Sequence, residues 1–238
     1  MSGGSSQIEG DGQMVRPVVV ITGAAGALGS ATSRVFQEAG YRLVQIDRVA
    51  ACLGGSCGDV IVETAELSDR GAIGAIRDRA LAAFGRIDAL CNVAGGFAMG
   101  DPVHRLDMTV WQNLMAGNVE SILTTASVFV PSLIDARGSV VNVAALGGLR
   151  GRAGMSAYGV AKSAVMRLTE SMAEELACEG VRVNAVLPGT IDTPANRAAM
   201  PAADRSLWVE PEAIAEVMLF LCSSRARAIS GALLPVGR

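Results

Sequence analysis

Short apolar runs alternate with longer stretches of helical periodicity along most of the chain. The runs are rich in Val, Ile and Leu, which is typical of strands buried on both faces. They predict strands over Val18–Ile21, Arg42–Ile46, Val60–Thr64, Ile87–Asn92, Ser139–Val143, Val181–Leu187 and Ala232–Val236. Apolar residues at helical spacing predict helices that end near Gly40 and that cover Ala72–Phe84, Thr109–Leu133, Met155–Cys178 and Pro211–Leu221.

This alternation indicates βαβ units and therefore a parallel sheet. We expect an α/β protein with a single-domain Rossmann fold, in which a doubly wound, mostly seven-stranded parallel sheet carries helices on both faces. No linker or change of composition divides residues 15–238, so we interpret them as one domain. The segment Gly189–Val209 is polar, contains prolines and is long for a connection in such a fold, which is typical of binding loops.

The ends and the charge of the chain narrow its class. The first 14 residues are rich in Gly and Ser and lack the apolar core of a signal peptide, so we expect a disordered leader. The chain has 20 basic and 23 acidic residues, and its net charge of −3 argues against nucleic acid or an anionic membrane as a partner. No uninterrupted apolar stretch reaches the ~18 residues of a spanning helix. These features favour a soluble, cytoplasmic protein.

Five cysteines are scattered along the chain, an odd number that argues against a disulfide framework. Cys52 and Cys57 are close enough in sequence to chelate a metal together, but His104 is the only histidine that could join them. We therefore expect free thiols and no metal site.

The first strand leads into a glycine-rich turn and the start of a helix, in the segment PVVVITGAAGALGS. Small residues here allow a tight turn, a close approach of backbone N–H groups to a pyrophosphate, and close packing of the helix on the strand. The helix N-terminus adds the positive end of its dipole. A tight βα loop without a ligand is the alternative. The candidate phosphate-binding residues are Gly23, Ala25, Gly26, Ala27, Leu28 and Gly29.

The second strand ends in Asp47, 18 residues past Gly29. A carboxylate at this place can accept hydrogen bonds from the ribose hydroxyls of NAD and repels the additional phosphate of NADP. Asp47 could instead cap the following segment. Arg48 follows directly and would attract a 2′-phosphate, which softens the preference. We predict NAD as the cofactor, with NADP less favoured.

Tyr158 and Lys162 are four residues apart near the start of a predicted helix and therefore lie on one of its faces. A lysine cation beside a tyrosine favours the phenolate and lowers the tyrosine pKa, which makes the pair suitable for proton transfer. The alternative is a packed tyrosine and a solvated lysine.

Several motifs, in the order in which they occur, resemble those of the short-chain dehydrogenase/reductase family. Thr22–Gly29 is similar to the family's TGxxx(A/G)xG turn, and Asn92–Gly95 to its NxAG segment. Tyr158–Lys162 matches YxxxK, and Pro188–Pro194 resembles the PG motif. Asn118 lies where the family has a helix asparagine. The similarity covers residues from about 15 to 238 and implies an NAD(P)-dependent oxidoreductase that transfers hydride between nicotinamide and a small organic substrate.

The resemblance also assigns roles to residues. It implies that Tyr158 relays a proton, that Lys162 tunes the tyrosine and binds the nicotinamide ribose, and that Asn118 anchors a water in the proton path. Ile191 and Thr193 would meet the nicotinamide carboxamide. The further cofactor contacts that it implies are Arg48, Glu66, Leu67, Asn92, Ala94, Gly95, Pro188 and Gly189.

One position departs from the family pattern. The family has a serine 13 residues before the tyrosine, which holds a carbonyl oxygen in line for reduction, and this chain has Ala145 there. The dihydropteridine reductases of the same family also have alanine at this position, and Ala89–Phe97 and Leu187–Trp208 resemble their segments locally. Three interpretations stay open: a quinonoid dihydropteridine-like substrate, carbonyl or alcohol chemistry with Ser156 or Asn118 orienting the oxygen, and a catalytically impaired cofactor-binding relative.

Assembly is the last expectation from the resemblance. Members of this family usually pair the two helices predicted over Thr109–Leu133 and Met155–Cys178 across a twofold axis. The resemblance therefore implies a homodimer or homotetramer.

Overall fold

The computed structural model describes residues 16–49 and 56–237. The predicted leader over residues 1–14, and Cys52, lie outside the described residues. Seven strands form one sheet in the order β3-β2-β1-β4-β5-β6-β7, and every pairing in it is parallel. The strands are β1 (Val18–Thr22), β2 (Arg42–Asp47), β3 (Val60–Thr64), β4 (Ala89–Asn92), β5 (Ser139–Val143), β6 (Arg182–Pro188) and β7 (Leu233–Val236). The predicted α/β fold with a doubly wound seven-stranded sheet is confirmed.

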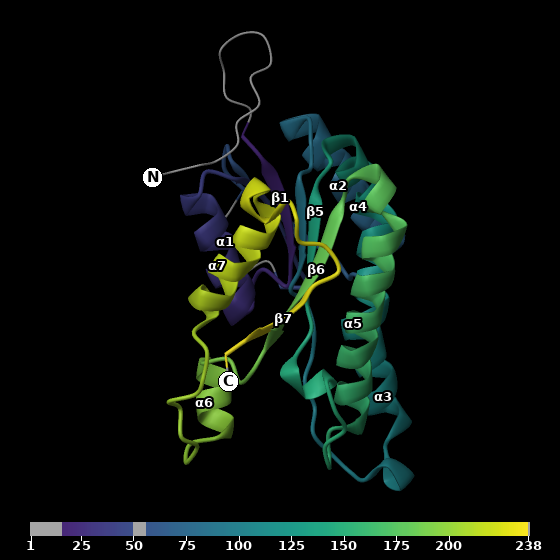
Figure 1. The fold of residues 1–238 in the computed structure, drawn as a ribbon, viewed down its shortest axis with the longest axis vertical. Helices are drawn as coiled ribbons and strands as arrows, with labels where there is room; N and C mark the ends of the chain where they lie inside the picture. Colours follow the sequence, from purple (N-terminus) through teal and green to yellow (C-terminus); the bar gives the residue numbers. More distant parts are fainter. Residues whose placement is uncertain (1–15, 50–55, 238) are drawn as a thin grey trace.

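Helices cover both faces of the sheet. They are α1 (Ala27–Glu38), α2 (Arg70–Phe84), α3 (Met108–Met115), α4 (Ser121–Ala136), α5 (Ser156–Glu175), α6 (Pro194–Ala199) and α7 (Pro211–Cys222). Figure 1 shows α1 and α7 on one side of the sheet and α2, α4 and α5 on the other.

The two cores follow from the alternation of side chains along each strand. In β1, Val18 and Val20 belong to the cluster under α2, α4 and α5, whereas Val19 and Ile21 belong to the cluster under α1 and α7. All of β1 is buried, which explains why its sequence is a continuous apolar run rather than an alternating one.

Local sequence sets several helix ends. Asp69 caps α2 by accepting a hydrogen bond from the backbone N–H of Ala72, and Gly85 ends the same helix with a φ of 77°. Asp107 accepts from the backbone N–H of Thr109 at the start of α3, and Thr193 accepts from that of Asn196 at the start of α6.

The structure differs from the predicted elements in two places. The single helix expected over Thr109–Leu133 consists of α3, a π-helical segment over Ala116–Glu120, and α4. Gly189–Val209 was expected to be an irregular polar stretch, but it contains α6, whose Pro194 occupies the first turn, where proline is tolerated.

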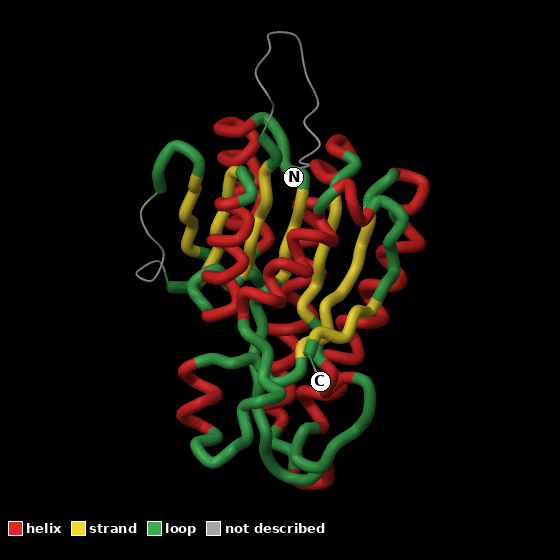
Figure 2. Tube along the Cα trace, turned by 60° about the vertical axis from the view of Figure 1, so that its left-hand side comes forward, coloured by secondary structure: helices red, strands yellow, loops and turns green. Residues whose placement is uncertain are grey.

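The connections diverge at the centre of the sheet. The chain leaves β1 for α1 on one face and leaves β4 for α3 and α4 on the other, although β1 and β4 are neighbours. A crevice beyond the carboxyl ends of the strands forms at such a switch point and is where ligands bind in open α/β sheets. Figure 2 shows the long loops and α6 gathered beyond one end of the strands.

Met108–Ala136 is the one segment among the described residues that is long and apolar enough to span a membrane, by length and composition only. Its most apolar window has a mean hydropathy of 1.3, and 44% of that window is buried. Because α4 packs against β4 and α2, these apolar residues belong to the core of the fold.

Candidate active site

The turn after β1 brings two backbones close together. Gly23 has a φ of +66°, and a Cβ built on it would lie 2.7 Å from the Cα of Ala94 in the loop after β4. A Cβ on Gly29 would lie 2.0 Å from the carbonyl oxygen of Gly23, so α1 can start this close to the turn only with glycine there. Both positions therefore require glycine, as the sequence pattern indicated.

The N-terminus of α1 is open toward this turn. Gly26 is its N-cap, no side chain caps the helix, and its first turn contains no acidic residue. Ala27 and Leu28 are the first residues of the helix, and Ala25 directly precedes the cap. Exposed backbone N–H groups at the positive end of a twelve-residue helix fit a pyrophosphate, so the described residues of this turn are suited to a dinucleotide.

Asp47 is the last residue of β2 and is half-buried beside the same turn. Its Oδ2 accepts a hydrogen bond from the backbone N–H of Ala25 at 2.9 Å, and its Oδ1 accepts from that of Val49 at 3.2 Å. A carboxylate has about four acceptor sites, so two remain for the hydroxyls of a ribose. Arg48 is exposed immediately beyond it.

Glu66 and Leu67 follow β3 at the same edge of the sheet. Glu66 is exposed and its carbonyl accepts from the backbone N–H of Asp69, whereas Leu67 packs partly buried against the core. The structure thus places both predicted residues in the connection that follows the strand next to β2.

The loop after β4 is held by buried polar side chains. Asn92 donates to Asn142 Oδ1 and accepts from Thr125 Oγ1, each at 2.9 Å. The Oγ1 of Thr22 accepts from the backbone N–H groups of Val93 and Ala94 at 3.2 Å, which ties this loop to the end of β1. Asn92 is 3% exposed, so it supports the loop from below rather than facing a ligand.

Asn118 lies in the π-helical segment between α3 and α4. Its Nδ2 donates to the carbonyls of Leu114 and Gly96, at 2.9 and 3.2 Å, and its Oδ1 accepts from the backbone N–H of Gly96 at 3.3 Å. Both amide hydrogens are used, so the suggestion that the Asn118 side chain orients a substrate oxygen is disfavoured. Single π-turns inside α-helices occur frequently at functional sites.

Lys162 is buried next to Asn118. Its ammonium donates to the carbonyl of Val143, the last residue of β5, at 2.8 Å, and the residue is only 5% exposed. A Cβ on Gly95 would lie 2.6 Å from Asn118 Oδ1 and 3.3 Å from Lys162 Nζ. Residues from three separate elements therefore meet at one point.

Tyr158 is one helical turn before Lys162 on α5. Its ring packs edge-on against Phe97, with 4.9 Å between centroids, and a Cβ on Gly147 would lie 3.4 Å from its Cε1. The phenol is therefore placed between the loops that follow β4 and β5.

The pKa expected for Tyr158 is wrong in direction. Burial raises the pKa of Tyr158 to about 12, and burial lowers that of Lys162 to about 8. Desolvation dominates because it disfavours the charged form of each group, phenolate in one case and ammonium in the other. The lysine also directs its hydrogen bond to Val143 rather than to the phenol.

Ala145 is buried after β5, in extended backbone that leads into a short turn. A methyl group there donates no hydrogen bond. Ser156 is half-buried in the first turn of α5 and lines a cavity of about 290 Å³ together with Gly100, Val103 and Arg152. Ser156 therefore brings a hydroxyl to the wall of this cavity.

The loop after β6 carries the remaining predicted residues. Pro188 ends the strand, and the backbone N–H of Gly189 donates to the carbonyl of Val236. Ile191 packs against the core and pairs with Val209, and Thr193 caps α6 through its hydroxyl. The fold thus anchors both ends of the segment and leaves α6 between them.

Sequence reasoning missed several residues that shape this site. Thr22 was noted only as part of the turn motif, Gly147 was not singled out, and the contact of Phe97 with Tyr158 was not foreseen. For Thr22 the signal in the sequence was a hydroxyl directly before the first glycine of the turn. For Gly147 it was a pair of glycines shortly after the end of β5.

Three comparisons relate the chain to known proteins. The family model described as short chain dehydrogenase matches residues 17–204. The cis-4-hydroxycyclohexanecarboxylate dehydrogenase of Sinomonas cyclohexanicum is 34% identical over 235 residues, which cover 92% of this chain and 94% of that protein.

Two solved structures share the fold. A 3-ketoacyl-(acyl-carrier-protein) reductase from Brucella melitensis, in complex with NADH, is 26% identical with a TM-score of 0.82 and covers 92% of this chain and 96% of its own. ElxO with NADP bound is 21% identical with a TM-score of 0.85, covers 93% of this chain and 97% of its own, and shows likeness of fold alone.

Proposed function

The chain belongs to the short chain dehydrogenase family, and from its site we propose that it transfers hydride between NAD(H) and a small organic substrate. The observation that carries the proposal is that Lys162 and Asn118 lie together beside Gly95, with Tyr158 one helical turn before Lys162 on α5 and with a glycine turn suited to a dinucleotide after β1. Membership of this family identifies the chain as an oxidoreductase, whereas its cofactor and its substrate are our inferences.

NAD is supported by the chemistry of the second strand end. Asp47 keeps free acceptor sites and a negative charge beside the turn, which favours ribose hydroxyls over a 2′-phosphate. The exposed Arg48 would attract that phosphate, so we place NADP second. We propose that the Gly23–Gly29 turn holds the pyrophosphate and that the remaining cofactor contacts are those predicted from the sequence.

The residues of this chain perform the proton chemistry in this proposal. The nicotinamide, when bound, supplies or accepts the hydride. Tyr158 holds a proton at its phenol oxygen across neutral pH, because burial keeps its pKa near 12. Donation to a substrate oxygen leaves a phenolate, and the neighbouring Lys162 ammonium stabilises that charge. Asn118 fixes the loop after β4 through both hydrogen bonds with Gly96.

Carbonyl and alcohol chemistry is the substrate class that we favour. Ser156 can orient an oxygen in place of the missing serine, and Arg152 on the same cavity wall fits an anionic group of the substrate. The related dehydrogenase named above acts on a hydroxycyclohexane carboxylate, which combines a ring alcohol with such a group.

A substrate panel tests this function. NADH absorbance is followed with 4-oxocyclohexanecarboxylate, with uncharged ketones and with quinonoid dihydropterin, for the parent chain and for Arg152→Gln. We expect turnover of the keto acid, with a raised KM and a nearly unchanged kcat in Arg152→Gln. No turnover of any compound with NADH or NADPH would refute the enzyme and favour a cofactor-binding relative that has lost catalysis.

Ala145 supports a second candidate, reduction of a quinonoid dihydropteridine-like ring. Hydride enters a conjugated ring system in that reaction, so no isolated carbonyl oxygen has to be gripped, and the methyl group of Ala145 removes nothing that is needed. Faster turnover of the dihydropterin than of every ketone in the panel would decide for this candidate.

The cellular location and the assembly of the enzyme complete the proposal. The described cysteines are all free thiols, which fits a reducing cytoplasm. We also propose a homodimer or homotetramer, which light scattering tests directly.

A further inference from the structure

Two thiols meet between β4 and the C-terminal end of α7. Cys91 in β4 and Cys222, the last residue of α7, have their sulfur atoms 3.9 Å apart, although 131 positions separate them in the chain. Cys91 is fully buried and Cys222 is partly exposed. Nothing in the proposed hydride transfer uses either sulfur.

The end of α7 is held firmly where Cys222 lies. The guanidinium of Arg182 donates to the carbonyls of Leu221 at 2.6 Å and of Ser223 and Ala226 at 3.2 Å. A cation that binds the last carbonyls of a helix stabilises its C-terminus. The same cation lies near the Cys222 sulfur and favours its thiolate.

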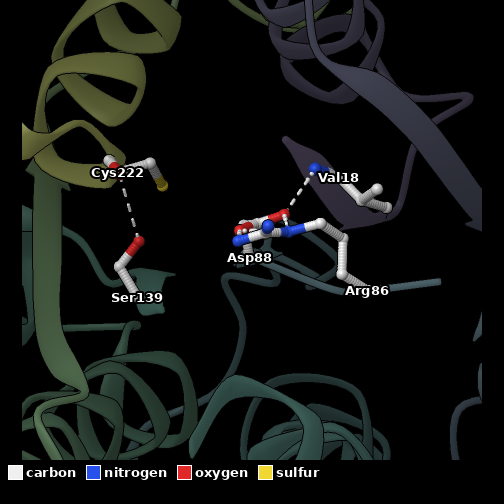
Figure 3. Close-up of polar contacts among 5 residues, drawn as sticks. All are labelled: Val18, Arg86, Asp88, Ser139 and Cys222. Carbon is white, nitrogen blue, oxygen red and sulfur yellow. Dashed lines mark hydrogen bonds and ion pairs between the residues drawn. The ribbon is translucent and has the colours of Figure 1, made fainter. Parts of the chain in front are cut away.

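A hydroxyl and a carboxylate also lie in the surroundings of this helix end. Figure 3 shows Ser139 beneath the end of α7, with its hydroxyl toward the Cys222 carbonyl at 3.5 Å. Figure 3 also shows Asp88, whose carboxylate accepts hydrogen bonds from Arg86 and from the backbone N–H of Val18. Its carboxylate is therefore compensated.

The two thiols differ in acidity. The hydrogen bond from Cys91 lowers the pKa of the Cys222 thiol against the opposing effect of burial, and the charge of Arg182 adds to this lowering, whereas the shared hydrogen bond and burial raise the pKa of Cys91. The partly exposed Cys222 is thus the better nucleophile, and the buried Cys91 lies close enough to attack an oxidised Cys222 sulfur.

We propose that Cys91 and Cys222 form a peroxide-sensitive dithiol that closes to an intramolecular disulfide. The Cys222 thiolate attacks one oxygen of hydrogen peroxide, the O–O bond breaks, and Cys222 sulfenic acid and water form once a proton is taken up. The Cys91 thiol then attacks the sulfenic sulfur, the S–O bond breaks, and a second water leaves. Two thiols and one peroxide give one disulfide and two waters.

The bond requires only a small movement. A disulfide needs the sulfur atoms at about 2.05 Å, which is about 1.9 Å closer than the two thiols lie. Cys222 is at the end of its helix, where a rotation of its side chain can move the sulfur toward Cys91. The resulting link would join the strand that carries Asn92 to the helix that follows residues 189–210.

The test uses a chain in which the three other cysteines, Cys52, Cys57 and Cys178, are changed to serine. Mass spectrometry after hydrogen peroxide should show a monomer that has lost two hydrogens, with a peptide linking residues 91 and 222 and full reversal by dithiothreitol. In the same background, Cys91→Ala should accumulate a Cys222 sulfenic acid that dimedone traps, and Cys222→Ser should leave Cys91 unmodified.

Other outcomes overturn the proposal. Sulfinic acid at Cys222 with Cys91 still a free thiol would show that the pair does not close. A disulfide between two chains would show that Cys91 of the same chain is not the partner of Cys222. Trapping of Cys91 by dimedone in Cys222→Ser would show that Cys91 reacts with peroxide without Cys222. All readouts are covalent, so they stand whether or not the proposed hydride transfer is correct.

Discussion

Replacing Lys162 by methionine should change how the stability of the fold depends on pH. The ammonium is 5% exposed, and burial lowers its pKa from the ordinary 10.5 to about 8. The unfolded chain therefore binds this proton more tightly than the folded chain. The lysine destabilises the fold below pH 8, and the destabilisation is lost as pH rises from about 8 to 10.5.

The magnitude follows from the size of the shift. Each pKa unit corresponds to about 1.4 kcal/mol, so the buried charge costs about 3 kcal/mol at neutral pH. Between pH 7 and about pH 9.5 the parent should gain about 2 kcal/mol of unfolding free energy relative to Lys162→Met. Other groups titrate in both proteins and cancel in the difference.

Urea unfolding of both proteins at the two pH values, at one protein concentration, measures this difference. Arg167→Met is the matched control, because Arg167 is exposed on the same helix and stays charged throughout. A parent-minus-variant difference that is the same at both pH values would show that Lys162 is not held as a desolvated cation. A parent-minus-variant difference that falls with pH would mean that the folded protein binds the Lys162 proton more tightly than the unfolded chain, which contradicts the lowered pKa of Lys162.

Three further substitutions test other parts of the site. Asp47→Asn keeps an oxygen for the backbone N–H of Ala25 but removes the charge, so calorimetric titration should show the NADPH-to-NADH affinity ratio rising about tenfold, as ~1.4 kcal/mol gives; an unchanged ratio contradicts the proposed role. Ala145→Ser should raise kcat/KM for ketones about tenfold, since it restores a hydrogen bond of ~1.5 kcal/mol, and a loss of rate would argue for the dihydropterin-like substrate. Gly23→Ala should lower the melting temperature, because its Cβ would meet Ala94 at 2.7 Å. Gly74→Ala in α2 has open space around it and should raise the melting temperature, because alanine in a helix stabilises the fold by ~0.5–1 kcal/mol relative to glycine. Equal effects of the two substitutions would contradict the close approach of the loops.

The sequence predicts the fold well because its strands are strongly patterned. β1 is buried on both faces, so its apolar run is continuous, and the bounds of both β1 and β6 lie within one residue of those predicted. The glycine turn is equally clear, since Gly23 and Gly29 are positions where any side chain would collide with backbone. Such constraints are local, and a single sequence displays them.

The parts that escaped prediction depend on tertiary contacts. The π-helical segment at Asn118 leaves the 3.6-residue periodicity nearly intact, so the apolar pattern reads as one helix. The raised pKa of Tyr158 results from burial between two loops, and spacing in the sequence carries no measure of desolvation. The short helix α6 is exposed, and its six residues have no apolar stripe to announce it.

The transfer of deuterium to the reduced product from NADH that carries deuterium at both C4 positions tests the central claim most directly, in the parent and in Tyr158→Phe. The experiment uses whichever compound of the panel is turned over, and mass spectrometry counts the deuterium that the product carries. The account predicts one deuterium per product molecule in the parent and a rate at least about a hundredfold lower in Tyr158→Phe, because general acid catalysis contributes about that much. Product without deuterium, or equal rates in the two proteins, would contradict it.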